Sequence, residues 1–157
     1  MRGEEVVKKI VVCVSILLFA SVVIFSTTEL YEQSFEAKSF GVYARGEGIS
    51  HVFDNVFENG LSSEIFNITP EIFYSYNLGG EVLGEFFETD AQNFNLTAFA
   101  YRLGLVVEKT TQVGSIYNIY ARSSMLPYRI SGQNFNIQIA IDGERVKVAS
   151  PIILGSF

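Results

Sequence analysis

The feature that most constrains this chain is an uncharged apolar run near its N-terminus. Residues 10–25 carry no charge, and Lys8 and Lys9 lie directly in front of them. A helix rises about 1.5 Å per residue, so about 20 residues cross a hydrocarbon core of roughly 30 Å. Serine and threonine extend the run as far as Thr28, because their hydroxyl groups can bond back to a helix backbone. The sequence therefore predicts a transmembrane helix over residues 10–28.

The charges that flank this run predict its orientation. Arg2, Lys8 and Lys9 precede it, whereas three glutamates follow it before the next base, Lys38. The positive-inside rule then gives a cytoplasmic stub over residues 1–9 and an extracytoplasmic remainder. We expect a single-pass protein of the cell membrane with the lipid bilayer as its first partner. A cleaved secretory signal peptide is the alternative, although the run exceeds the usual length of roughly 7–15 residues and no A-x-A-like site follows it.

Composition limits what the outer part of the chain can bind. Residues 29–157 contain 8 Lys and Arg against 15 Asp and Glu, a net charge of −7. Nucleic acid requires basic patches, so we expect no nucleic-acid partner. The only cysteine, Cys13, lies in the apolar run. The outer part therefore has neither a disulfide nor a cysteine-based zinc site, and its stability must come from packing.

The segment after the apolar run has a helix-compatible pattern. Apolar residues with helical spacing recur at Ile49, Val52, Phe53, Val56 and Phe57. This spacing is typical of an amphipathic helix, and the following Asn-Gly pair is a helix stop. The sequence predicts an extracytoplasmic helix over residues 29–60, which leaves the membrane and packs on the domain that follows.

Residues 61–157 read as an antiparallel β-domain. Strands are expected at residues 72–76, 82–87, 105–109, 116–120, 135–141 and 145–149. The last two form a hairpin with one buried face, in which Phe135, Ile137, Ile139 and Ile141 face inward. Asp142 and Gly143 form its two-residue type I′ turn. The apolar tail, residues 152–157, covers a sheet edge or meets a partner. The predicted fold class is α+β: a long N-terminal transmembrane and amphipathic helix, then a small antiparallel β-sheet domain.

This layout resembles type IV pilins and the pilin-like surface proteins of archaea. The stretch over residues 126–137, LPYRISGQNFNI, is similar to a recurring pattern in those archaeal proteins, where a Leu-Pro pair and an Ile-x-Gly lead into the penultimate strand. The resemblance implies a membrane-anchored subunit or accessory component of a surface assembly. It also implies self-association or contact with other pilin-like subunits.

No constellation in the sequence points to catalysis, a cofactor or a metal. His51 is the only histidine, and its place beside the apolar stripe favours a surface or core-edge imidazole over a catalytic one. Acidic residues that recur around an expected turn are the nearest approach to a cation site, and a solvated acidic rim is the competing interpretation. They are Glu81, Glu85, Glu88 and Asp90. We therefore expect no enzyme, no cofactor and no metal.

Two glycosylation sequons are present in stretches expected to be loops. Asn67 begins Asn-Ile-Thr and Asn95 begins Asn-Leu-Thr. Both would lie on the outer side, where an oligosaccharyltransferase acts, and both are candidate glycosylation sites.

Two functions remain open from the sequence. The first is a membrane-anchored structural or interaction protein, a pilin-like subunit whose helix packs with copies or partners. The second is a tethered binding module that holds a ligand or cation at the acidic loop over residues 81–90. The first should co-purify with itself or with similar chains, whereas the second should gain thermal stability from its ligand.

Overall fold

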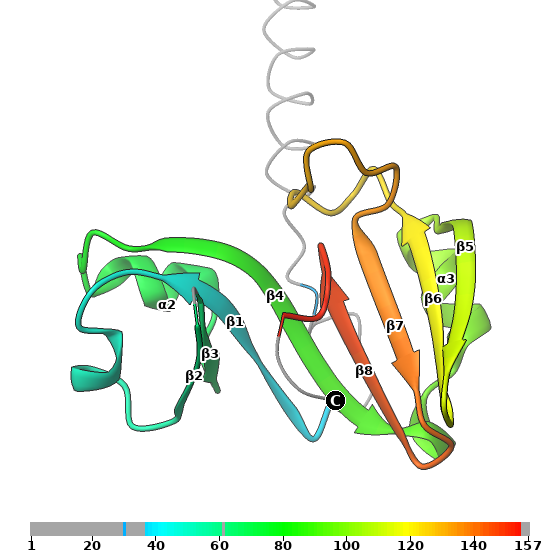
Figure 1. The fold of residues 1–157 in the computed structure, drawn as a ribbon, viewed down its shortest axis with the longest axis horizontal. Coiled ribbons are helices and arrows are strands. Elements are labelled where there is room, and N and C mark those ends of the chain that lie inside the picture. The colour runs from blue at the N-terminus through cyan, green and yellow to red at the C-terminus, as the bar shows by residue number, and fades with distance from the viewer. Residues whose placement is uncertain (1–29, 31–36, 61, 155–157) are drawn as a thin grey trace, which may run out of the picture.

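A computed structural model describes residues 30, 37–60 and 62–154, which form an antiparallel sheet of eight strands with short helices (Figure 1). The strand order is β2-β3-β1-β4-β8-β7-β6-β5. The strands are β1 (Ser39–Arg45), β2 (Val56–Asn59), β3 (Ser62–Phe66), β4 (Glu81–Asp90), β5 (Val106–Val113), β6 (Ile116–Arg122), β7 (Ile137–Ile141) and β8 (Arg145–Ser150). The helices are the 3₁₀ turns η2 (Ile49–His51) and η3 (Ala91–Asn93) and the α-helices α2 (Pro70–Ser75) and α3 (Leu96–Leu103).

The predicted long helix over residues 29–60, and with it the α+β fold class, is wrong for the described residues. Residues 39–45 and 56–59 are strands, and the helix-like spacing that begins at Ile49 yields only the single turn η2. Strand β1 lies in the middle of the sheet and is buried on both faces, so its sequence lacks a visible two-residue alternation. The β-domain therefore begins well before residue 61.

Close packing at Gly41 explains why β1 can form there. A Cβ atom at this position would lie 2.0 Å from the carbonyl oxygen of Ile65 on β3 and 2.8 Å from the Phe86 ring. Glycine allows the two backbones to approach, so a residue that weakens a helix is here required by a sheet.

The predicted transmembrane helix, residues 10–28, lies outside the described residues. Within the part that the structure describes, no helix combines the length and the apolar character needed to cross a membrane.

Strand β4 joins the two ends of the molecule (Figure 1). It is ten residues long and pairs with β1 along one edge and with β8 along the other. We call residues 45–81, which contain η2, β2, β3 and α2, the α2 lobe. We call residues 96–122, which contain α3, β5 and β6, the β5 lobe. The two lobes lie at opposite ends of the longest axis.

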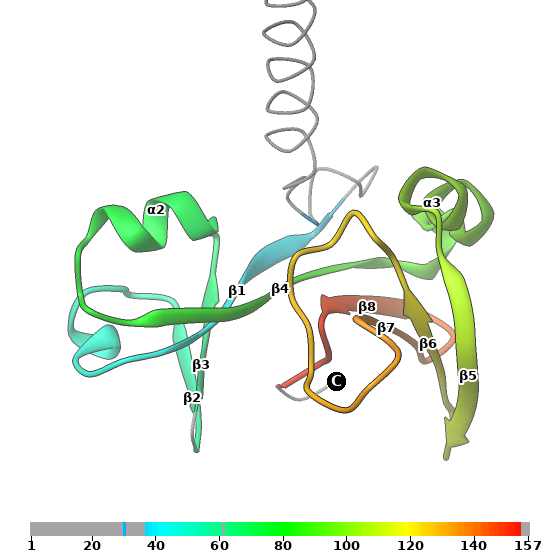
Figure 2. The same ribbon diagram turned by 90° about the horizontal axis from the view of Figure 1, so that it is seen from above.

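The sheet is curved, with α2 and α3 on one side, while β2, β3 and β5 project toward the other (Figure 2). Two apolar clusters occupy the helix side. The larger joins Phe99 and Leu103 of α3 to the inward side chains of β6, β7 and β8. The smaller joins Phe73 of α2 to Val42 and Ala44 of β1.

The opposite, concave face of the sheet is also covered. Tyr43, Phe86 and Ala149 form a third cluster, and Ile153 and Leu154 of the C-terminal segment pack against it. The Ile153 amide donates a hydrogen bond of 3.1 Å to the side chain of Gln138 on β7. The described part of the tail, residues 152–154, thus lies across this face rather than along a sheet edge.

The C-terminal hairpin forms as predicted, with two differences in its strands and one in its turn. Ile139 pairs with Val148 and Ile141 with Val146, but both faces are buried, because the tail covers the second one. The centre of the Phe135 ring lies 4.9 Å from the centre of the Tyr120 ring. Tyr120 lies on the opposite face of β6 from its neighbour Ile119, which belongs to the larger apolar cluster. Phe135 therefore does not follow the inward alternation.

The hairpin turn is displaced by one residue from the prediction. Because Asp142 donates its amide to the Arg145 carbonyl at 3.1 Å, the two central residues are Gly143 and Glu144. Gly143 has φ +94°, as the first central residue of a type II′ turn requires. The Asp142 carboxylate accepts the amides of both Glu144 and Arg145, which fixes this register.

Residues 72–75 belong to α2, with Tyr76 as its C-cap, so the strand predicted over residues 72–76 does not form. Thr69 is the N-cap, its hydroxyl accepting the Ile72 amide at 3.4 Å, and Pro70 is the first helical residue. These capping signals outweigh the β-propensity of the aromatic residues that follow.

Candidate binding sites

The four acids expected to form a cation loop are spread along strand β4. Successive side chains of a strand point to opposite faces, so the residues cannot converge. Each acid has its own partner: Arg45 with Glu81 at 2.7 Å, the Leu30 amide with Glu85 at 2.8 Å, Lys147 with Glu88 at 3.0 Å and Lys38 with Asp90 at 2.6 Å. Among the described residues, no group of three or more His, Cys, Asp or Glu side chains is arranged to hold a metal ion.

The remaining residues singled out in the sequence lie apart from one another. His51 is exposed at the end of η2. Asn67 is exposed just after β3 with φ +58°, in the loop that was expected there. Asn95 is exposed as the N-cap of α3, where its side-chain oxygen accepts the Ala98 amide at 2.9 Å. Glycosylation of the two asparagines stays a prediction.

A buried contact holds the residue that follows the apolar run. Leu30 is 0 % exposed and belongs to the larger apolar cluster. Its backbone N–H donates to the carboxylate of Glu85, which is itself buried on the helix side of β4. The Tyr128 phenol hydrogen-bonds the same carboxylate. Burial raises the pKa of Tyr128 above its usual range, and the negative charge of Glu85 raises this pKa further.

A second buried contact crosses the concave face. The Lys147 ammonium on β8 lies 2.6 Å from the Glu64 carboxylate on β3 and 3.0 Å from that of Glu88. Only 3 % of each of the Lys147 and Glu64 side chains is exposed. The ammonium also lies 5.1 Å from the centre of the Phe86 ring. Strands β1 and β4 lie between β3 and β8 in the sheet, so this ion pair connects the α2 lobe to the centre of the molecule.

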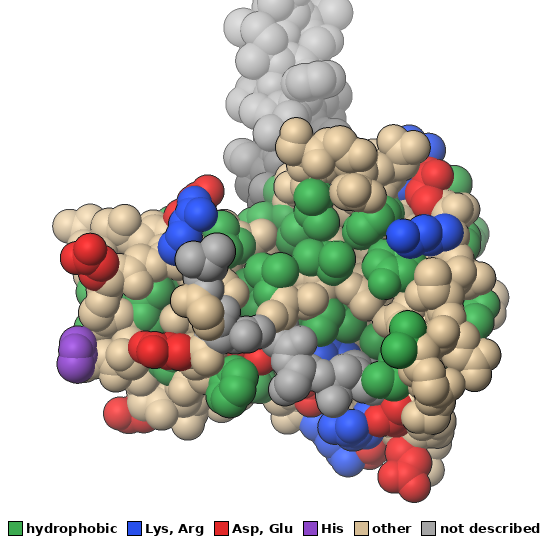
Figure 3. Space-filling view, in the orientation of Figure 1, with side chains coloured by type: hydrophobic (Ala, Val, Ile, Leu, Met, Phe, Trp, Pro, Cys, Tyr) green, Lys and Arg blue, Asp and Glu red, His purple; other side chains and the backbone are tan. Residues whose placement is uncertain are grey.

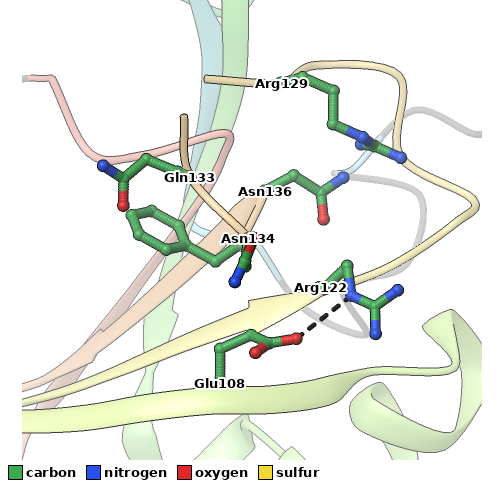
Figure 4. Close-up of a pocket in the computed structure, with 7 residues that line it drawn as sticks. Glu108, Arg122, Arg129, Gln133, Asn134 and Asn136 are labelled. Atoms are coloured by element: carbon green, nitrogen blue, oxygen red, sulfur yellow. Dashed lines mark hydrogen bonds and ion pairs between the residues drawn. The ribbon is translucent and has the colours of Figure 1, made fainter. Parts of the chain in front are cut away.

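A cavity of about 490 Å³ lies where β5 and β6 meet the loop before β7 (Figure 4). We call it the arginine–amide pocket. Its lining residues are Glu108, Arg122, Arg129, Gln133, Asn134, Phe135 and Asn136. Arg122 donates to Glu108 at 3.2 Å, the ion pair drawn in Figure 4.

The Arg129 guanidinium is held by backbone carbonyls. It donates to the carbonyl oxygens of Leu126, Tyr128 and Ser123, the last two at 2.8 and 3.1 Å. The Asn136 amide donates to two of the same carbonyls, which makes the loop rigid. Within the described part of the chain Arg129 forms no ion pair, so the pocket carries one positive charge that no carboxylate balances.

Sequence reasoning selected residues 126–137 for their resemblance to a pattern but did not identify a site there. Two of the pocket residues, Glu108 and Arg122, come together through the β5–β6 hairpin, which turns at Gly114 and Ser115 after the paired residues Val113 and Ile116. Arg122 lies beyond the predicted strand 116–120, and Glu108 lies at an irregularity in the register between Val107 and Lys109, so pairing the predicted strands residue by residue does not reveal this contact. The role of Arg129 depends on loop geometry that no local pattern encodes.

Comparisons with family models, with curated proteins and with solved structures found no match to this chain.

Proposed function

We propose that the chain is a single-pass, membrane-anchored extracytoplasmic protein that acts by contact, as a structural or interaction component of a surface assembly. The proposal retains the pilin-like interpretation as a prediction. It does not retain the long extracytoplasmic helix as the means of assembly, because residues 39–59 contribute two strands to the sheet. The contacts must then involve the β-domain itself.

The observation that carries the proposal is the burial of Leu30. This residue follows the predicted transmembrane segment at a distance of two positions, and it is fully enclosed by the domain core. If residues 10–28 span the membrane, the domain is held next to the membrane surface and not on a long tether. A domain held in this way is suited to contacts with neighbours in the same membrane.

Fractionation of cells that express the full chain tests the anchor. The protein should remain with membranes through high-salt and carbonate washes, because a span of about 19 residues inserts far more strongly than a surface-bound helix. Protease added to intact cells should remove the domain and protect the N-terminal stub. Replacing Arg2, Lys8 and Lys9 with Glu should weaken or invert this orientation. A soluble product that begins between Ser26 and Glu32 would refute the anchor.

A second candidate function is binding of an anionic small molecule in the arginine–amide pocket. The unbalanced charge of Arg129 and the exposed amides of Gln133 and Asn134 favour a carboxylated sugar, which offers both an anion and hydroxyl groups. Glucuronate should then raise the melting temperature of the full chain in detergent, whereas uncharged glucose should not. Arg129→Gln should weaken the effect, because it removes the unbalanced charge. An unchanged melting temperature of the native chain in glucuronate would eliminate this function.

A further inference from the structure

Exposed large apolar side chains occur only at the two ends of the described structure. Five lie over the α2 lobe: Val52, Phe57, Ile72, Tyr74 and Tyr76. Five lie over the β5 lobe: Tyr101, Val106, Val107, Val113 and Tyr117. Strands β1, β4, β7 and β8 between them contribute none. Clustered apolar exposure marks interaction surfaces, so the distribution points to one surface at each end.

The α2 lobe presents a groove between η2 and α2. It has a volume of about 240 Å³ and is lined by six apolar residues together with the polar Asp54, Asn55 and Asn67. The apolar members are Val52, Phe53, Phe66, Ile68, Ile72 and Tyr76. The rings of Phe53 and Tyr76 pack edge to face at 4.8 Å, so the apolar wall is preformed.

The β5 lobe presents a projecting edge. All eight residues of β5 are exposed, and the strand has a pairing partner, β6, on only one side. Its last residue, Val113, is 68 % exposed at the end of the β5–β6 hairpin. An edge strand with exposed valines is a surface that favours contact with another chain.

The two lobes carry opposite charge. The α2 lobe contains one base and six acids, a net charge of −5, or −4 without the buried Glu64 that Lys147 neutralises, and Figure 3 shows acidic side chains over this end. The β5 lobe contains three bases, Arg102, Lys109 and Arg122, and one acid, Glu108, a net charge of +2. Like ends of two copies repel each other and unlike ends attract, which favours a head-to-tail contact over a symmetric one.

We propose that copies of this chain associate head to tail, with the β5–β6 hairpin of one copy docked on the α2-lobe groove of the next. The inference rests on the proposed function, which brings copies together in one membrane. The two surfaces differ, so the contact is heterologous and leaves one surface of each kind free at the ends of a row. Such a contact generates extended rows or closed rings.

Cysteine cross-linking of the full chain in membranes tests the contact. Cys13→Ser removes the only native cysteine. Ile72→Cys and Val113→Cys are then placed on separately tagged copies in the same cells, and the membranes are mildly oxidised. The two tags should appear in one disulfide-linked dimer. A copy that carries both substitutions should give a ladder of higher oligomers.

Two controls define the geometry. Tyr101→Cys lies in the β5 lobe and is 89 % exposed, but it is on α3 and away from the hairpin. Paired with Ile72→Cys, it should cross-link several-fold less than Val113→Cys does. Lys109→Glu should lower the cross-linking yield several-fold, and adding Asp54→Lys on the neighbouring copy should restore it. Raising the salt concentration should also lower the yield.

Each outcome either supports or overturns the head-to-tail contact. Dimers of Val113→Cys alone, at the yield of the mixed pair, would show symmetric pairing of β5 edges and overturn the proposal. Absence of mixed dimers, or equal cross-linking from Tyr101→Cys, would overturn it too. Cross-linking is assayed in whichever fraction holds the chain. A membrane-bound chain without mixed dimers refutes only this contact, whereas a soluble chain refutes the anchor.

Discussion

The two lobes are built from the same sheet but are held in different ways. The β5 lobe contributes α3 and β6 to a cluster of eleven buried residues, whereas the cluster beneath α2 has seven. The α2 lobe is also held from the concave face by the buried Glu64–Lys147 ion pair. Strand β5, in contrast, is exposed on both faces and is held by its pairing with β6. Substitutions that remove a contact of the α2 lobe should therefore lower the free energy of unfolding much more than similar substitutions on β5.

The largest effect should come from Lys147→Met. This substitution leaves the Glu64 carboxylate buried without its cation and should lower the free energy of unfolding by about 3–5 kcal/mol. Lys109→Met is the matched control, since Lys109 also lies over an aromatic ring, 4.6 Å from the centre of Tyr120, but is exposed. Its cost should be about 1 kcal/mol or less.

Urea unfolding of the full chain in detergent, followed by circular dichroism, measures both lysine variants. Adding Glu64→Leu to Lys147→Met should recover most of the loss, because the buried Glu64 carboxylate without a cation is then removed and only the partly exposed Glu88 loses its ion pair. Equal losses for the two single lysine variants would mean that the lobes are not held differently.

A smaller loss should follow Gly41→Ala, which tests the backbone contact between β1 and the α2 lobe. The new methyl group would lie 2.0 Å from the Ile65 carbonyl oxygen, so β3 must move away from β1. We expect a loss of about 3 kcal/mol, at the upper end of the usual range for overpacking. Thr111→Ala on exposed β5 should change stability by less than about 0.5 kcal/mol. A neutral Gly41→Ala would show that the strands do not approach each other so closely.

The ease of prediction from sequence also differs between the two halves of the chain. Strands β4 to β8 were all predicted, because each pairs with a sequence neighbour or has turn residues such as Gly114 and Gly143 beside it. Strands β1 to β3 were not. Strand β1 pairs with β4 about 40 residues away, and its Val42 and Tyr43 are buried on opposite faces, so no local alternation reveals it. The helical spacing that begins at Ile49 corresponds to no long helix, because only the single turn η2 forms there and strand β2 follows it.

The sequence indicates some residues of the candidate sites, but not which residues they contact. The acids of β4 were noticed, but their partners Leu30, Lys38 and Lys147 come from distant segments and could not be assigned. Opposite charges on the two lobes could be counted in the sequence. Their meaning depends on the fold, which separates residues 45–81 and 96–122 at opposite ends of one sheet.

Tyr128→Phe tests the loop that connects the two halves, since Tyr128 packs against the α2-lobe core while its hydroxyl bonds Glu85. Losing that donor should cost about 1–2 kcal/mol near pH 8. The raised pKa of Tyr128 means that the unfolded chain loses this proton at a lower pH than the folded protein does. The contribution of Tyr128 to the free energy of unfolding should therefore be fully present below about pH 10 and decrease above it.

Comparing urea midpoints of Tyr128→Phe and the native chain at pH 8 and pH 10.5 separates these two effects. The gap between the two proteins should narrow at the higher pH, because only the native chain has this tyrosine to titrate. A constant gap would show that Tyr128 is not held in its protonated form by the fold.

The smallest effect compares the helix caps of the two lobes. Asn95 caps α3 with a bond of 2.9 Å, whereas Thr69 caps α2 with a longer bond of 3.4 Å. Asn95→Ala should therefore cost about 1 kcal/mol and Thr69→Ala about 0.5 kcal/mol, because replacing an N-cap with alanine costs about 0.5–2 kcal/mol and the longer bond of Thr69 is expected at the lower end. Asn95→Ala also destroys a sequon, so Thr97→Ala, which destroys the same sequon and keeps the cap, is the necessary control. If Thr97→Ala lowers the melting temperature as much as Asn95→Ala does, the loss comes from a missing glycan and not from the cap. If Thr69→Ala costs more than Asn95→Ala, the α2 lobe depends on its short helix more than its packing indicates.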